Sequence, residues 1–142
     1  MKIKAILLLI CLSFSNMCFA SEVLAPAIQF NIEDYKNYFR KSTDYKIYLK
    51  SRSDYKITCD SDIIGIVWGD KDNIKPYDRK NEAGEIIDMK STILKLKYAT
   101  NSYIRLYKSS REVVNIIINV NPLFDAEQTT SLGLCKLTPY RG

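Results

Sequence analysis

Short apolar runs separated by polar turns recur along this chain, and they predict a protein built mainly of β-strands. The clearest runs combine aromatic and β-branched side chains, which suit the pleated surface of a sheet. Tyr45–Leu49 and Tyr55–Thr58 are separated by a short polar stretch, and the pair predicts a β-hairpin. The remaining predicted strands cover residues 63–68, 103–108, 113–120 and 132–137.

One segment, Glu85–Thr100, decides the fold class because its pattern suits two structures. Its apolar positions from Ile86 to Thr100 are spaced 3, 4, 3 and 4 residues apart, which predicts an amphipathic helix. Leu94–Tyr98 alternates instead with the period of two that a strand requires. We favour the helix because its spacing extends over the longer stretch. A second, shorter helix is expected at Ile32–Phe39.

A polar segment between Gly69 and Gly84, with Pro76 inside it, predicts the longest loop of the chain. Binding residues often lie on long loops beside a rigid scaffold. Trp68, the only tryptophan, directly precedes this loop. Its ring is suited either to the core or to stacking on a sugar.

The N-terminus has the pattern of a bacterial Sec signal peptide. Lys2 and Lys4 precede an apolar run, Ala5–Phe14, which is too short to span a bilayer. We expect cleavage after Ala20, so that residues 1–20 are a signal peptide and residues 21–142 form one mature domain. The mature chain is then secreted through the periplasm, and we expect no transmembrane segment in it.

Two of the four cysteines, Cys59 and Cys135, remain after that cleavage. In an oxidising compartment we expect them to form one disulfide. The chain has no histidine, which excludes Ser-His-Asp triads and mixed Cys/His zinc sites. The paired acids Asp60 and Asp62 lie in an Asp/Ser cluster that is typical of a turn. We therefore expect a binding protein and no enzyme, with no cofactor and no metal.

The charge pattern argues against nucleic acid as a partner. The full chain carries 21 Lys and Arg against 16 Asp and Glu, a net +5, and loss of Lys2 and Lys4 leaves 19 − 16 = +3. These charges are interleaved along the sequence instead of forming one basic cluster.

Three short motifs resemble the B subunits of AB5 bacterial toxins. Asn31-Ile32-Glu33-Asp34 is similar to the start of the N-terminal helix in the cholera and heat-labile toxin B chains. Met89-Lys90-Ser91-Thr92, followed by Tyr98-Ala99-Thr100, resembles the long helix of those chains. Residues 134–140 resemble the cysteine-bearing tail of pertussis-type B chains. Typhoid-toxin and subtilase-cytotoxin B chains have a similar layout and size.

The resemblance implies a small five-stranded OB-type barrel with one longer helix. It also implies a homopentamer or mixed pentamer that binds host glycoprotein or glycolipid sugars and delivers a toxin A subunit. Lys90, Lys95 and Lys97, on the polar face of the helix, would then line the central pore. The chain departs from the cholera pattern at the positions that match that family's disulfide, which fall near Lys36 and Tyr107.

The sugar-binding side chains expected from this resemblance and from the loop are few. The sialic-acid-binding pertussis-like chains use a serine near the first strand. The stacking tryptophan of the cholera family, which follows the long helix, is replaced here by Lys108-Ser109-Ser110. Loop residues offer hydrogen bonds to sugar hydroxyls or to a sialic-acid carboxylate, although an ordinary solvated loop has the same composition. The candidates are Ser42, Thr43, Trp68, Tyr77, Asp78 and Arg79.

A second resemblance stays open beside the first. Ile57-Thr58-Cys59, followed by Gly65-Ile66-Val67-Trp68 and a partner cysteine near the C-terminus, is similar to the invasin-type tip subunits of chaperone/usher fimbriae. Those proteins are immunoglobulin-like β-sandwiches completed by a donated strand. This alternative requires Thr92–Tyr98 to be a strand. It implies an adhesin or invasin in place of a toxin subunit.

Overall fold

The structure, a computed structural model, describes residues 22–141. The predicted signal peptide, residues 1–20, lies outside the described residues. Strands and one short 3₁₀ helix follow one another as β1 (Val23–Pro26), η1 (Ile32–Tyr35), β2 (Lys41–Leu49), β3 (Asp54–Cys59), β4 (Ile63–Trp68), β5 (Ile74–Lys80), β6 (Ser91–Leu96), β7 (Thr100–Lys108), β8 (Glu112–Val120), β9 (Thr130–Leu132) and β10 (Cys135–Pro139). Among the described residues, no helix is long and apolar enough to cross a membrane.

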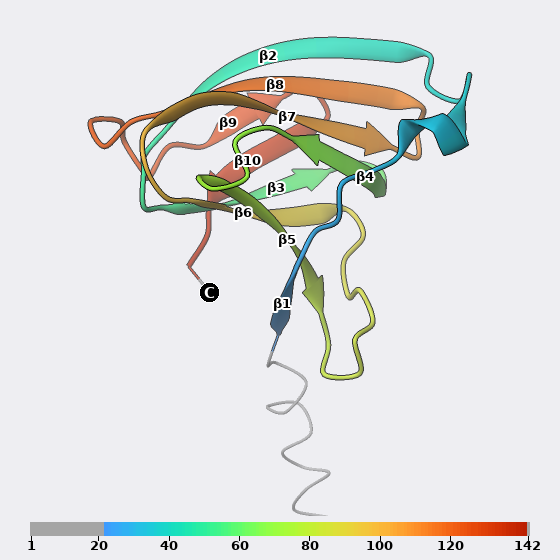
Figure 1. The fold of residues 1–142 in the computed structure, drawn as a ribbon, viewed down its shortest axis with the longest axis horizontal. Helices are drawn as coiled ribbons and strands as arrows, with labels where there is room; N and C mark the ends of the chain where they lie inside the picture. Colours follow the sequence, from blue (N-terminus) through green and yellow to red (C-terminus); the bar gives the residue numbers. More distant parts are fainter. Residues whose placement is uncertain (1–21, 142) are drawn as a thin grey trace, which may run out of the picture.

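The strands form two open sheets that pack against each other (Figure 1). The six-stranded sheet has the order β1-β5-β6-β3-β10-β9, and the four-stranded sheet has the order β2-β8-β7-β4. Within them, β10-β3-β6-β5 faces β4-β7-β8. This is the strand order of an immunoglobulin-type sandwich, with β10 in the position of the first strand. β2 adds to the edge of the smaller sheet, parallel to β8.

The core lies between the sheets and is built from alternate side chains of each strand. On β8, Val114, Ile116 and Ile118 are at most 1% exposed, whereas the intervening Ile117 is 54% exposed. Alternation of this kind fixes strand register, because a slip by one residue would move every buried side chain to the outer face. The side chains on the outer faces are not needed for the core, so they can serve in binding.

The helix predicted at Glu85–Thr100 is wrong, and so is the OB-type barrel that depends on it. Ser91–Leu96 is strand β6, which pairs with β3 on one side and β5 on the other. Side chains on both faces of this central strand are buried: Leu94 belongs to the core, and Ile93, which points to the opposite face, is also fully buried. Two buried faces produce an apolar run without clean alternation, and here that run mimicked helical spacing. The immunoglobulin-like alternative required a strand at Thr92–Tyr98, and β6 covers most of that range.

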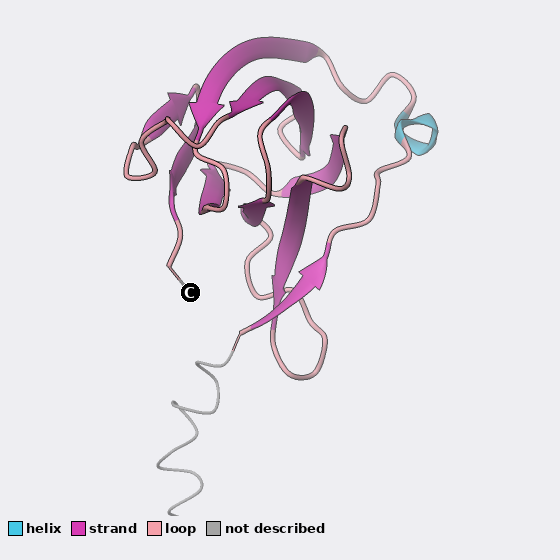
Figure 2. Cartoon of the chain, turned by 60° about the vertical axis from the view of Figure 1, so that its left-hand side comes forward, coloured by secondary structure: helices cyan, strands magenta, loops and turns pink. Residues whose placement is uncertain are grey.

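The second predicted helix is reduced to the single turn η1 (Figure 2). Asn31 caps it, since the side-chain oxygen of Asn31 accepts a hydrogen bond from the backbone N–H of Glu33 at 3.1 Å. The expected hairpin also fails, because β2 and β3 belong to different sheets. Arg52, with a φ of 58°, lies in the turn where the chain crosses between the sheets.

Two further predictions about the chain's organisation need correction. The expected long loop from Gly69 to Gly84 contains strand β5, which ends next to the short N-terminal strand β1. The single strand predicted at 132–137 is two strands, β9 and β10, which pair with each other around Gly133. Gly133 has a φ of 68°, a conformation that suits glycine at such a tight turn.

The predicted disulfide is confirmed. Cys59 on β3 and Cys135 on β10 are direct cross-strand neighbours, with Cα atoms 3.9 Å apart and an S–S bond between them. The bond closes a loop over a sequence separation of 76 residues, which restricts the unfolded chain by about 4 kcal/mol in the entropy model.

Candidate recognition face

The outer face of the four-stranded sheet presents its side chains in rows that run across the strands. Strand pairing sets these rows, because residues directly opposite each other on neighbouring strands point to the same face. The rows combine charged, amide, aromatic and aliphatic groups, in contrast to the mainly apolar inner face. The two central rows are Asp44–Asn115–Arg105 and Lys46–Ile117–Tyr103.

An aromatic cap covers one end of this face. The Phe30 and Phe39 rings each lie 4.9 Å from the Tyr107 ring, centroid to centroid, and leave Tyr107 only 4% exposed. Phe30 sits directly over Gly65, where a Cβ atom would lie 2.1 Å from the Phe30 ring. Gly65 is therefore required by close approach of the Phe30 ring. The segment that carries the cap is held by Tyr38, whose hydroxyl donates to the Ser109 carbonyl at 2.7 Å.

Beside the cap the face is hollowed into an open groove of about 500 Å³. Asn115 Nδ2 donates to Asp44 Oδ1 at 3.0 Å and to Ser42 Oγ, so the amide is held by two neighbours on β2. The Arg105 guanidinium lies 5.1 Å from the Tyr103 ring centroid, within the range of a cation–π contact. Ile32 of η1 contributes an apolar wall to the groove.

This set of groups is suited to binding sugars. An exposed aromatic face stacks on the apolar face of a pyranose, and carboxylate, amide and guanidinium groups exchange hydrogen bonds with its hydroxyls. Tyr103 is 38% exposed, so its ring is accessible to such a ligand. Among the described residues, no cluster of three or more metal-ligating side chains accompanies the groove.

Of the predicted glycan-binding residues, the structure places only Ser42 in this groove. Its neighbour Thr43 faces the opposite side of β2, as strand alternation requires, and its hydroxyl is 3.5 Å from Glu112 Oε2. Tyr103, Arg105 and Asn115 were not among the candidates. Each is a polar or aromatic residue at an outward position of an apolar strand, and that alternation could have identified them. The sequence does not show, however, that β2 pairs with β8 in parallel, and this pairing brings their side chains together with those of β2.

Trp68 belongs mainly to the core, with 9% of its surface exposed. Gln29 holds the strand end there, because its side chain accepts from the Trp68 backbone N–H at 3.3 Å and donates to the Trp68 carbonyl at 3.0 Å. Trp68 and Tyr77 do line one small pocket of about 230 Å³, together with Lys71 and Pro26. The structure therefore brings these two predicted residues together, away from the groove.

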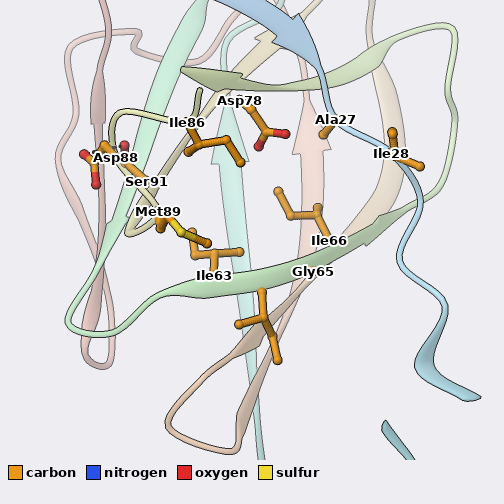
Figure 3. A pocket seen from close by; sticks show the side chains of 11 residues that line it. Ala27, Ile28, Ile63, Gly65, Ile66, Asp78, Ile86, Asp88, Met89 and Ser91 are labelled. Carbon is orange, nitrogen blue, oxygen red and sulfur yellow. Dashed lines mark hydrogen bonds between the residues drawn. The ribbon is translucent and has the colours of Figure 1, made fainter. Parts of the chain in front are cut away.

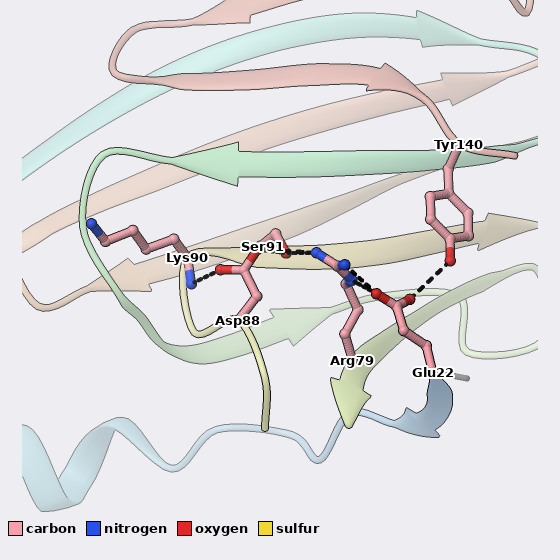
Figure 4. Close-up of polar contacts among 6 residues, drawn as sticks. All are labelled: Glu22, Arg79, Asp88, Lys90, Ser91 and Tyr140. Atoms are coloured by element: carbon pink, nitrogen blue, oxygen red, sulfur yellow. Dashed lines mark hydrogen bonds and ion pairs between the residues drawn. The ribbon is translucent and has the colours of Figure 1, made fainter. Parts of the chain in front are cut away.

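Arg79 acts as a structural clamp instead of a free sugar ligand (Figure 4). Its Nε donates to Glu22 Oε1 at 2.7 Å, and its Nη1 lies 3.0 Å from Asp88 Oδ2. Tyr140 Oη donates to Glu22 Oε2 at 3.2 Å, which adds the C-terminal segment to the cluster. The hydrogen bond from Arg79 holds the pKa of Glu22 below its usual value. Arg79 therefore joins β1, β5 and the segment before β6.

The three lysines expected to line a pore share no helix. Lys95 lies on β6, where its Nζ is 3.9 Å from Asp54 Oδ2, while Lys90 and Lys97 flank the two ends of that strand. The pore-lining prediction is therefore wrong, because it depended on the helical spacing of this segment.

Comparison of the chain with protein-family models, with curated proteins and with solved structures finds no match. The groove and its side chains therefore carry the information about function.

Proposed function

We propose that this chain is an exported, non-enzymatic recognition domain that binds host-cell surface glycans through the outer face of its four-stranded sheet. The observation that carries the proposal is the groove of about 500 Å³, which combines an accessible tyrosine with a prearranged set of hydrogen-bonding groups. Tyr103 provides the stacking surface. Asp44, Asn115 and Arg105 contact the hydroxyls of the bound sugar.

The strand arrangement favours an adhesin or invasin over a toxin delivery subunit. The toxin resemblance implied a barrel and a pore-lining helix, and neither is present among the described residues. A sandwich with a strand at this position is what the adhesin alternative required. The edge of β8 that faces away from β7 is occupied by the chain's own β2, so this adhesin needs no donated strand there. Single sugar sites are weak, and display of many copies on one surface supplies avidity.

A glycan array probed with the mature protein tests this proposal. We expect Tyr103→Ala to reduce binding at least tenfold, because it removes the stacking surface. Tyr98→Ala is the matched control, since Tyr98 is 61% exposed and lies in a different pocket, beside Arg52 and Pro122. No binding to any glycan, or equal losses from both variants, would contradict the proposal. Sedimentation of the same samples should return a monomer, whereas a ring of five would restore the toxin interpretation.

A further inference from the structure

A second cavity lies where strands β4 and β5, from different sheets, leave the sandwich open (Figure 3). Its volume is about 180 Å³, which is small for a drug-sized ligand and suits a single side chain. The walls are mostly aliphatic and include Ile63, Ile66, Ile86 and Met89. None of these residues belongs to the candidate recognition face.

Asp78 is the exceptional group in this cavity. It lies between the outward-facing Tyr77 and Arg79 on β5, and Figure 3 shows its carboxylate directed into the cavity. Among the described residues, no hydrogen bond or ion pair reaches that carboxylate. The other acid of the cavity, Asp88, is neutralised by Arg79 at 3.0 Å and accepts a hydrogen bond from Ser91 at 2.8 Å.

An unpaired carboxylate beside aliphatic walls is costly, because desolvation favours its neutral form. Burial raises the pKa of Asp78, and the positive charge of Lys80 opposes this effect without cancelling it. A cationic group placed in the cavity would remove the cost by pairing with the carboxylate. Complementarity of charge therefore selects a positively charged occupant.

The rim of the cavity is apolar and unusually open to solvent. Ile28 is 87% exposed, Ile86 is 43% exposed and Met89 is 47% exposed. Exposed aliphatic groups that gather around one opening are typical of an interaction site. They suit the methylene stem of a long cationic side chain and the apolar residues on either side of it.

We propose that this cavity, the Asp78 pocket, is a docking site for a partner polypeptide that inserts a lysine side chain between apolar neighbours. Lysine suits the pocket better than arginine, because a guanidinium has five donors to satisfy and the pocket offers one unpaired carboxylate. The pocket lies apart from the groove. The domain therefore has two independent binding surfaces, one for a glycan and one for a partner polypeptide.

Titration of the ¹³C-methyl-labelled mature protein by NMR tests the docking site. The probe is the capped peptide acetyl-Leu-Lys-Leu-amide, and its partner replaces lysine with norleucine, which removes only the charge. We expect the lysine peptide to shift the methyl signals of Ile63, Ile66 and Met89 and to bind at least tenfold more tightly than the norleucine peptide. Asp78→Asn should abolish this preference, while Asp72→Asn, at an exposed turn, should preserve it.

Three outcomes would overturn the proposal. Equal affinity for the two peptides would show that charge has no role. Retention of the preference in Asp78→Asn would place the cation elsewhere. A response to free n-pentylammonium without any response to the lysine peptide would exclude a polypeptide as the source of the amine. Glycan binding through Tyr103 is measured separately, so failure of one site leaves the other unaffected.

Discussion

Two charged side chains of this sandwich, the buried Lys108 and the half-buried Asp78, have different surroundings. Lys108 is fully buried, with its Nζ 2.7 Å from Asp60 Oδ1 and 2.9 Å from Glu112 Oε1. Asp78 faces an aliphatic cavity, and no ion pair reaches it among the described residues. A buried charge with partners is compatible with a stable fold, whereas a half-buried charge without partners weakens the fold and is available to a ligand.

The two groups also respond differently to their burial. Desolvation alone would lower the pKa of Lys108, but hydrogen bonds to Asp60 and Glu112 outweigh it and raise that pKa. For Asp78, desolvation acts almost unopposed and raises the pKa towards the neutral form. Desolvation therefore disfavours the charged form of both groups, and only Lys108 has close partners that offset it.

The largest expected effect comes from breaking the paired site. Lys108→Met keeps an apolar stem of similar length but removes the closer cation of Glu112, which then has only the exposed Lys41 at 3.8 Å. A hydrogen bond to a charged group contributes about 1.5–3 kcal/mol, so the free energy of unfolding should fall by about that amount. Urea denaturation measures it. Lys71→Met, at an exposed position, is the control. A loss below about 0.5 kcal/mol would show that the ion cluster contributes little beyond packing.

A smaller effect of opposite sign is expected at the unpaired site. Asp78→Asn removes the charge at nearly constant shape, so the folded protein should gain about 1 kcal/mol at neutral pH, the lower end of the cost of an unsatisfied buried group. Thermal unfolding of the two proteins at pH 7 measures the gain. If Asp78→Asn were instead destabilising, the carboxylate would have a partner that contributes to the fold, and the comparison with Lys108 would fail.

Sequence patterns identified most strands but not their partners. Val113–Val120 and Ile63–Trp68 were recognisable because their composition alone suits a sheet. Ser91–Leu96 was misassigned because side chains on both of its faces are buried, Leu94 in the core and Ile93 on the opposite face, through contacts between residues far apart in the sequence. The groove depends on the parallel pairing of β2 with β8, and the Asp78 pocket on the meeting of β4 and β5 from different sheets. A local sequence pattern does not reveal such contacts. The Cys59–Cys135 disulfide was predictable because only two cysteines follow the predicted signal peptide and the expected compartment is oxidising.

The smallest expected effect is a difference between pH profiles. The folded-state pKa of Asp78 lies above its ordinary value of 3.8, so the folded protein holds this proton more tightly than the unfolded chain does. The contribution of Asp78 to stability is therefore most favourable below that ordinary value and declines as the pH rises through the folded-state pKa. Asp60 has the opposite sign, because Lys108 lowers its pKa and its contribution is lost as the pH falls.

Urea midpoints measured from pH 3 to pH 7 separate these two contributions. Subtracting the Asp78→Asn profile from that of the native protein should leave a difference that becomes less favourable to the native protein with rising pH. Lys108→Met should instead remove a stabilisation that grows as Asp60 ionises. A flat difference for Asp78→Asn would mean that its carboxylate titrates alike in the folded and unfolded states. The Asp78 carboxylate would then be an ordinary solvated group, and the proposed docking of a cation in the Asp78 pocket would lose the desolvation that favours it.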